Sequence, residues 1–229
     1  KTRMVIINSP SNPTGAVYSA DELQALGTVL RAHPRVVIIS DDIYEPICWT
    51  TAHPPTLARV VPELAERTVV VNGVSKAYAM TGWRIGYAAG PATLIRAMKT
   101  LQSQSTSNPC SISQAAATAA LTGDQQCITP MVAAYRSRHD WLIPALNAIP
   151  GIAARPVEGS FYCFPDVSAA LPRLGLEDDQ AFARLLLDRA GVAVVPGSAF
   201  GGPGHVRISF ATGLDALQEA VARLSDLLA

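Results

Sequence analysis

Several features that would assign the chain to a particular class of protein are missing from its sequence. The 18 basic and 18 acidic residues cancel, so there is no basic excess for nucleic acid or an anionic membrane, and no acidic tail. No stretch approaches the ~18 consecutive apolar residues of a membrane-spanning helix. The four cysteines include no Cys-x-x-Cys pair and are too sparse for a disulfide framework. These absences predict a soluble cytoplasmic protein with reduced thiols, which binds neither nucleic acid nor membrane.

Apolar runs and helical patterns alternate through the first part of the chain. Four apolar runs predict strands, at residues 5–8, 36–40, 68–72 and 85–89. The runs at 36–40 and 68–72 are typical of strands buried in a parallel sheet, and 85–89 is a weaker case of the same kind. After the first run, Ser19 and Glu22 have the spacing of a capping box that begins a helix, which Pro34 closes. Strands that alternate with helices predict a wound α/β fold with a mostly parallel sheet.

The pattern changes after Pro91, where helices are expected at residues 91–104, 111–121 and 125–149. Beyond Pro150 an α+β pattern follows, with strands near residues 161–165, 192–195 and 206–210 and helices at 178–190 and 214–228. The chain opens on a strand that leads directly into a polar loop, which is typical of the C-terminal part of a larger α/β domain. We therefore predict such a part over residues 1–125, a long interdomain helix over 126–149, and a small α+β domain over 150–229.

Three of the expected strands end in loops that carry polar side chains. Asn12, Asp41 and Lys76 each follow a strand, and open α/β sheets bind ligands at the carboxyl ends of their strands. A lysine in such a loop can lose its proton and attack a carbonyl. Arg84, eight residues further on, has the planar fork that holds a phosphate. The same residue types also form ordinary turns and caps, so both readings stay open on chemistry alone.

A metal site is the less favoured reading of the acidic residues in this region. Asp41, Asp42 and Glu45 follow one strand closely. The sequence supplies neither histidines beside them nor the octahedral oxygen set that such sites use. We therefore expect no metal.

The loops at residues 12–15, 41–44 and 73–86 together resemble those of the class I/II aminotransferases, the pyridoxal phosphate enzymes of fold type I. The segment Gly-Val-Ser-Lys-Ala-Tyr-Ala-Met-Thr-Gly-Trp-Arg-Ile-Gly at 73–86 fits the cofactor-lysine motif of that family. Residues 103–109, Ser-Gln-Ser-Thr-Ser-Asn-Pro, are similar to the branch of bacterial aspartate and prephenate aminotransferases. Residues 204–211 resemble the C-terminal motif that binds the substrate carboxylate. The similarity extends over essentially the whole chain.

The resemblance implies roles for the residues at the cofactor ring. Lys76 forms the Schiff base with pyridoxal phosphate and then moves a proton between the substrate Cα and the cofactor C4′. Asp41, three residues before Tyr44 as the motif requires, pairs with the pyridinium nitrogen and keeps it protonated. Tyr44 and Asn12 donate hydrogen bonds to the phenolic oxygen, and Asn12 also lies at the substrate. Asp42 is expected on the opposite face of the chain.

The resemblance also implies how the phosphate and the substrate are held. Arg84 binds the cofactor phosphate, assisted by Ser75, and Arg207 binds the substrate α-carboxylate. Some family members have a serine where this chain has Gly73, so that hydroxyl contact is lost.

The function implied is transfer of an amino group between a 2-amino acid and a 2-oxo acid, in a homodimer. The substrates implied are those of the aspartate/prephenate type, or an aromatic amino acid with 2-oxoglutarate. Two alternatives stay open: another fold type I reaction such as that of a C–S lyase, and a non-catalytic regulatory domain that binds pyridoxal phosphate. Family members are nearly twice as long, and their N-terminal portion carries a glycine-rich phosphate loop and an aromatic ring that stacks on the cofactor. We therefore expect this chain alone to be incomplete as an enzyme.

Overall fold

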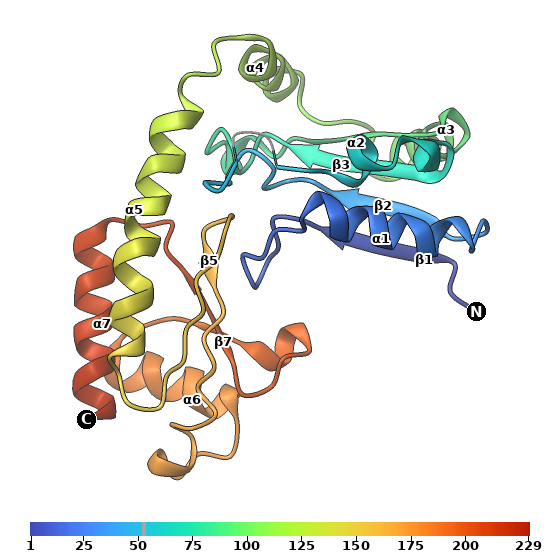
Figure 1. Ribbon diagram of the computed structural model, residues 1–229. Coiled ribbons are helices and arrows are strands. Elements are labelled where there is room, and N and C mark those ends of the chain that lie inside the picture. The colour runs from blue at the N-terminus through green and yellow to red at the C-terminus, as the bar shows by residue number, and fades with distance from the viewer. Residues whose placement is uncertain (52–53) are drawn as a thin grey trace. The chain divides into compact units, whose positions relative to one another are not determined.

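The computed structural model describes residues 1–51 and 54–229, and the chain divides into two compact units (Figure 1). The N-terminal unit comprises Lys1–Ser11 and Ala16–Val132, and the C-terminal unit comprises Asn12–Gly15 and Ala133–Ala229. The division along the chain falls within helix α5, Ile128–Asn147.

A four-stranded sheet of order β1-β2-β3-β4 organises the N-terminal unit (Figure 1). Strands β1 (Met4–Asn8), β2 (Val37–Asp41) and β3 (Thr68–Gly73) run parallel, and their register pairs Asn8 with Asp41 and Asp41 with Val71. The carboxyl ends of these three strands therefore lie at one edge of the sheet, as the alternating pattern predicts.

Helix α1 (Ala20–Arg31) packs on this sheet through one apolar face. The predicted capping box is confirmed: the Ser19 hydroxyl accepts from the Glu22 N–H at 3.2 Å, and the Glu22 carboxylate accepts from the Ser19 N–H at 2.8 Å. Leu23 is 1% exposed and packs against the strands, and burial of such a side chain contributes about 1.5–3 kcal/mol. Arg67 donates to carbonyl oxygens at and beyond the C-terminal end of α1, including those of Leu30 at 2.6 Å and Val36 at 2.7 Å.

Two short elements, α2 (Leu57–Val60) and the 3-10 helix η1 (Pro62–Arg67), connect β2 to β3, although the sequence pattern does not predict them. Helices α3 (Ala92–Ser105) and α4 (Ser111–Thr122) follow the sheet and begin and end within one residue of their predicted bounds.

The expectation that residues 85–89 form a buried strand of parallel type is wrong. Strand β4 (Gly86–Ala89) pairs antiparallel with β3, and Tyr87 on it is 41% exposed. The connection over residues 74–85 contains only the 3-10 turn η2 (Thr81–Trp83), and without a crossover helix the chain returns beside β3 in the opposite direction.

A three-stranded antiparallel sheet of order β5-β7-β6 organises the C-terminal unit. Its strands are β5 (Tyr162–Cys163), β6 (Val195–Pro196) and β7 (Val206–Ser209). The strand expected at residues 192–195 thus forms later, at Val195–Pro196. Helix α6 (Asp179–Leu185) continues as one π-helical segment, η4 (Leu186–Ala190), and α7 (Leu214–Leu228) has its predicted bounds. Two 3-10 turns, η3 (Pro172–Leu174) and η5 (Gly197–Phe200), complete the unit.

Residues 12–15 belong to the C-terminal unit although they follow β1 in the chain. The Gly15 carbonyl accepts from the N–H groups of Glu158 at 3.3 Å and Gly159 at 3.1 Å. Gly15 has φ +70°, and an added Cβ would lie 2.7 Å from Val157 Cβ. Only glycine fits this position without strain.

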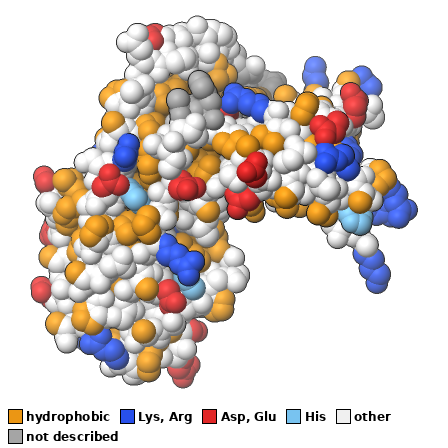
Figure 2. Space-filling model, in the orientation of Figure 1, with side chains coloured by type: hydrophobic (Ala, Val, Ile, Leu, Met, Phe, Trp, Pro, Cys, Tyr) orange, Lys and Arg blue, Asp and Glu red, His pale blue; other side chains and the backbone are white. Residues whose placement is uncertain are grey.

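Acidic, basic and apolar side chains are interspersed on the face drawn in Figure 2, in keeping with equal numbers of acidic and basic residues. Within the described ranges, no helix combines the length and the apolar character needed to cross a bilayer.

Candidate functional site

Lys76 lies in a tight loop directly after β3. The loop is closed by bonds from the Val74 N–H to the Ile85 carbonyl at 3.4 Å and from the Ala79 N–H to the Lys76 carbonyl at 3.2 Å. Val74 is fully buried, which anchors the loop to the unit. Lys76 itself is half-buried, so its amine is held near the sheet edge but stays accessible.

Gly73, where some family members have serine, is fixed by lack of space. A Cβ at this position would lie 2.9 Å from the Ile85 carbonyl oxygen and 3.1 Å from Ile43 Cδ1. Residues 85 and 86, which lead into β4, pack so closely against β3 that only glycine fits at position 73. A serine here would gain a hydroxyl but would clash with these residues. Ser75 is half-buried between Val74 and Lys76.

Asp41 and Tyr44 lie at the end of the neighbouring strand β2. The Asp41 carboxylate accepts from the Ile43 N–H at 3.3 Å, and the Asp41 carbonyl accepts from the Asn8 amide at 3.0 Å. Tyr44 is 4% exposed, and its ring centroid lies 5.8 Å from the Lys76 ammonium nitrogen. The N-terminal unit thus brings Tyr44 and Lys76 together. Asp41 is the last residue of β2, which pairs with β3, the strand that leads into the Lys76 loop.

Asp42 differs from Asp41 in both burial and partners. It is 5% exposed, and its Oδ1 accepts from the Ser40 hydroxyl at 2.7 Å. Burial raises the pKa of Asp42 to about 6, against the lowering effect of the Ser40 bond. Asp41 is only half-buried, so the two adjacent carboxylates occupy different environments.

Arg84 ends the loop in a left-handed backbone conformation, with φ 55° and ψ 44°. Such a conformation is uncommon for a residue other than glycine. Its guanidinium is exposed and donates to the Thr81 carbonyl at 2.9 Å. The side chain is therefore oriented within the loop, with its remaining donors available.

Arg207 and Asn12 lie together in the C-terminal unit. Arg207 Nη1 donates to Asn12 Oδ1 at 2.9 Å, although the two residues are 195 positions apart. The guanidinium carbon lies 4.4 Å from the ring centroid of Tyr162 and 5.0 Å from that of Phe200. The sequence predicts Asn12 both at the cofactor and at the substrate with Arg207, and the structure brings Asn12 and Arg207 into contact.

Arg207 Nε is buried and has no hydrogen-bond partner within the described part of the chain. A buried donor without a partner costs about 1–3 kcal/mol. An oxyanion ligand would satisfy this N–H, and the planar guanidinium matches a carboxylate. The arrangement therefore fits a carboxylate-binding site.

Phe200 is a site residue that sequence reasoning does not single out. It comes from η5, before the strand of Arg207, and its ring is 38% exposed. The only signal is the glycine-rich loop at 197–204 just before Arg207.

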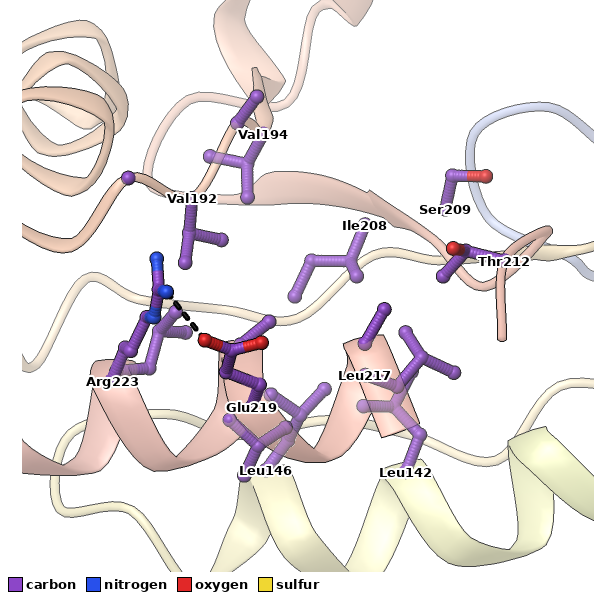
Figure 3. A pocket seen from close by; sticks show the side chains of 16 residues that line it. Leu142, Leu146, Val192, Val194, Ile208, Ser209, Thr212, Leu217, Glu219 and Arg223 are labelled. Atoms are coloured by element: carbon purple, nitrogen blue, oxygen red, sulfur yellow. Dashed lines mark hydrogen bonds and ion pairs between the residues drawn. The ribbon is translucent and has the colours of Figure 1, made fainter. Parts of the chain in front are cut away.

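A separate cavity of about 310 Å³ lies between α5, α7 and the strands of the C-terminal unit (Figure 3). Its walls are mainly aliphatic, and its charged side chains, Glu219 and Arg223, form an ion pair with each other at 2.5 Å. Ile208 lines it, and strand alternation turns Arg207 to the opposite face of β7. None of the predicted site residues lines this cavity.

The sequence profile of the family "aminotransferase class I and II" matches residues 1–224, so the chain belongs to this family. An aspartate/prephenate aminotransferase of Nitrosomonas europaea is 55% identical over all of this chain and 59% of its own length. An aspartate aminotransferase of Geobacillus stearothermophilus is 50% identical over 98% of this chain and 57% of its own length.

Solved structures of aminotransferases share the fold. The crystal structure of an aspartate aminotransferase from Rhizobium meliloti gives a TM-score of 0.92 at 47% identity, over 98% of this chain and 57% of that one. An aromatic aminotransferase from Pyrococcus horikoshii gives 0.91 at 38% identity, over 100% of this chain and 60% of that one. The chain thus has the predicted α/β architecture of fold type I. It spans 59% and 57% of the length of the Nitrosomonas europaea and Geobacillus stearothermophilus relatives.

Proposed function

We propose that the whole protein is a pyridoxal phosphate-dependent aminotransferase that moves an amino group between a 2-amino acid and a 2-oxo acid. The observation that carries this proposal is the lysine amine 5.8 Å from the buried Tyr44 ring, beside the strand that ends in Asp41. The amino acid is aspartate or an aromatic amino acid, and the 2-oxo acid is 2-oxoglutarate or prephenate. The names of the relatives support this substrate class.

The residues present fit this cofactor by their chemistry. The N-terminal unit offers an accessible amine on Lys76, a carboxylate on Asp41 and an exposed guanidinium on Arg84. These groups match an aldehyde, a ring nitrogen that carries a proton, and a phosphate. When bound, pyridoxal phosphate supplies the aldehyde that takes up the amino group and a ring that accepts electrons. Tyr44, Asn12 and Ser75 supply further hydrogen bonds.

Each side chain then has a defined task. Lys76 holds the cofactor and moves a proton at the substrate α-carbon. The Asp41 carboxylate keeps the ring nitrogen protonated through a charge-assisted hydrogen bond. Arg207, oriented by Asn12, binds the α-carboxylate with the Nε–H that is otherwise unsatisfied. This contact contributes to substrate binding in the ground state and the transition state alike.

We further propose that the protein is a cytoplasmic homodimer. All four cysteines, each within the described residues, are free thiols, which supports a reducing compartment. Leu101 on α3 and Ile112 on α4 are 73% and 70% exposed in this chain. Such apolar side chains support burial of these helices in the whole protein, against a second subunit or the rest of the chain.

The test is to locate the cofactor on the chain. Borohydride reduction of the loaded protein, followed by peptide mass mapping, is expected to leave a pyridoxyl group on Lys76. Lys76→Ala should lower amino transfer by ~10²–10⁴-fold, the worth of a positioned proton-transfer group. Lys99→Ala, which removes an exposed lysine on α3, is the matched control and should keep full activity.

Several outcomes contradict the proposal. A pyridoxyl group on Lys99, or on no lysine, would refute the assignment of Lys76. Release of ammonia from the amino acid in place of its transfer to a 2-oxo acid would identify a lyase, and cofactor binding without turnover would identify a regulatory domain.

A further inference from the structure

The loop between β6 and β7 brings an aromatic ring to the proposed carboxylate site. Residues 197–204 form this loop with His205, and the Phe200 ring centroid within it lies 5.0 Å from the guanidinium carbon of Arg207. The ring of Phe164 meets Phe200 edge-on at a centroid distance of 6.1 Å. Because a cation–π contact depends on the position of the ring face, the shape of this loop determines how Phe200 supports Arg207.

Asp179 fixes this loop at both ends. Its side chain is among the most buried in the protein, at 1% exposure. One carboxylate oxygen accepts from the Ser198 N–H at 2.7 Å and the other from the Gly204 N–H at 3.3 Å. Burial alone would raise the pKa of this carboxyl, but hydrogen bonds from the Ser198 N–H and side chain and from the Gly204 N–H hold it below its usual value. No ion pair to Asp179 occurs among the described residues, so hydrogen bonds stabilise its charge.

Helix capping does not account for the burial of Asp179. The preceding residue, Asp178, is already the N-cap of α6 and accepts from the Ala181 N–H at 2.8 Å. The loop also has its own closure, because the Gly197 N–H donates to the His205 carbonyl at 2.7 Å and the Gly202 N–H to the Gly197 carbonyl at 2.9 Å. Asp179 thus adds a bridge between residues 198 and 204 beyond capping and loop closure.

We propose that Asp179 is a positioning residue for substrate binding: its carboxylate holds the 197–204 loop so that Phe200 supports the Arg207 guanidinium. The inference rests on the proposed function of Arg207 as the carboxylate-binding residue. Two residues separate Asp179 from the substrate, because it acts through Phe200 on Arg207. Since Arg207 binds the carboxylate in both ground and transition states, a change in its position alters KM and leaves kcat.

The experiment measures KM and kcat of the whole, cofactor-loaded protein for a 2-oxo acid. Asp179→Asn keeps the side-chain volume but places an NH₂ group against one of the two N–H donors. We expect KM to rise about 5- to 30-fold, the range that corresponds to one cation–π contact, with kcat and cofactor content retained. Asp178→Asn is the matched control on the neighbouring residue: asparagine caps a helix about as well as aspartate, so stability and KM should both stay near the wild-type values.

A double-mutant cycle tests the route through Phe200. Phe200→Leu alone should raise KM, and Asp179→Asn combined with it should raise KM no further, because both changes remove the same contact. Additive effects would overturn the proposal. A reduced folded fraction with wild-type KM in Asp179→Asn would also overturn it, since that result identifies a structural role only.

Arg207→Ala in the same assay separates this inference from the proposed function. If Arg207→Ala raises KM while Asp179→Asn does not, the positioning role alone is wrong. If Arg207→Ala leaves KM unchanged, the carboxylate assignment is wrong and the role of Asp179 falls with it.

Discussion

Replacing Asp42 with asparagine should stabilise the folded protein at neutral pH. Asp42 is 5% exposed, and burial raises its pKa from 3.8 to about 6. The hydrogen bond from Ser40 opposes this rise, whereas the negative charges of Glu45 and Asp41 add to it. The folded state therefore binds a proton that the unfolded chain releases near pH 3.8.

The sign of the pH dependence follows from this raised pKa. The stabilisation is complete below pH 3.8 and is lost as the pH rises through about 6, because the charged carboxylate is poorly solvated in the folded state. At 1.36 kcal/mol per pH unit, the rise from 3.8 to about 6 corresponds to at most ~3 kcal/mol. Asparagine does not titrate and keeps an oxygen that can accept from Ser40. The unfolding free energy of Asp42→Asn should therefore increase relative to wild type, by up to ~3 kcal/mol between about pH 4 and 7.

Urea unfolding of both proteins at a series of pH values from about 4 to 8 measures this difference. Ser40→Ala provides a second test, because loss of a donor that favours the charged form should raise the Asp42 pKa further and extend the fall in stability to higher pH. In the same preparations, Asp42→Asn should retain amino transfer, whereas Asp41→Ala should lose it. A difference in unfolding free energy that does not change with pH, or a wild type more stable than Asp42→Asn at pH 7, would refute the reasoning.

Two further predictions concern Arg207 and Gly27. Arg207→Ala and Arg207→Lys should weaken binding of amino and oxo acids by ~1.5–3 kcal/mol, as measured by KM. Cofactor absorbance and melting temperature should stay nearly unchanged. A variant that unfolds, while its folded fraction binds amino acid normally, would show that Arg207 has a structural role. Gly27→Ala in α1 should destabilise by ~1–3 kcal/mol although alanine favours helices, because its Cβ would lie 2.7 Å from Val61 Cγ2. Chemical denaturation measures this, and addition of Val61→Ala should relieve the clash; a stabilised single variant would contradict it.

Local patterns predict much of the fold. The capping box of Ser19 and Glu22 and the helix over residues 214–228 form as predicted, because a helix start and an apolar stripe depend on residues a few positions apart. The positions of Asp41 and Lys76 after neighbouring strands follow in the same way, because each loop simply continues its strand. The family motifs then predicted the family itself, which the match over residues 1–224 confirms.

Other features depend on contacts between distant parts of the chain. The direction of β4, the lack of space at Gly73 and the bond between Asn12 and Arg207 arise only when separate segments meet. Asp179 has no local signal, since its neighbour Asp178 has the same side chain but caps a helix. The sequence by itself determined where most helices and strands form and which loops carry reactive side chains, because these depend on nearby residues. Burial and long-range hydrogen bonds decided which of two adjacent carboxylates is desolvated and which residues support Arg207, because both depend on neighbours that only the folded chain supplies.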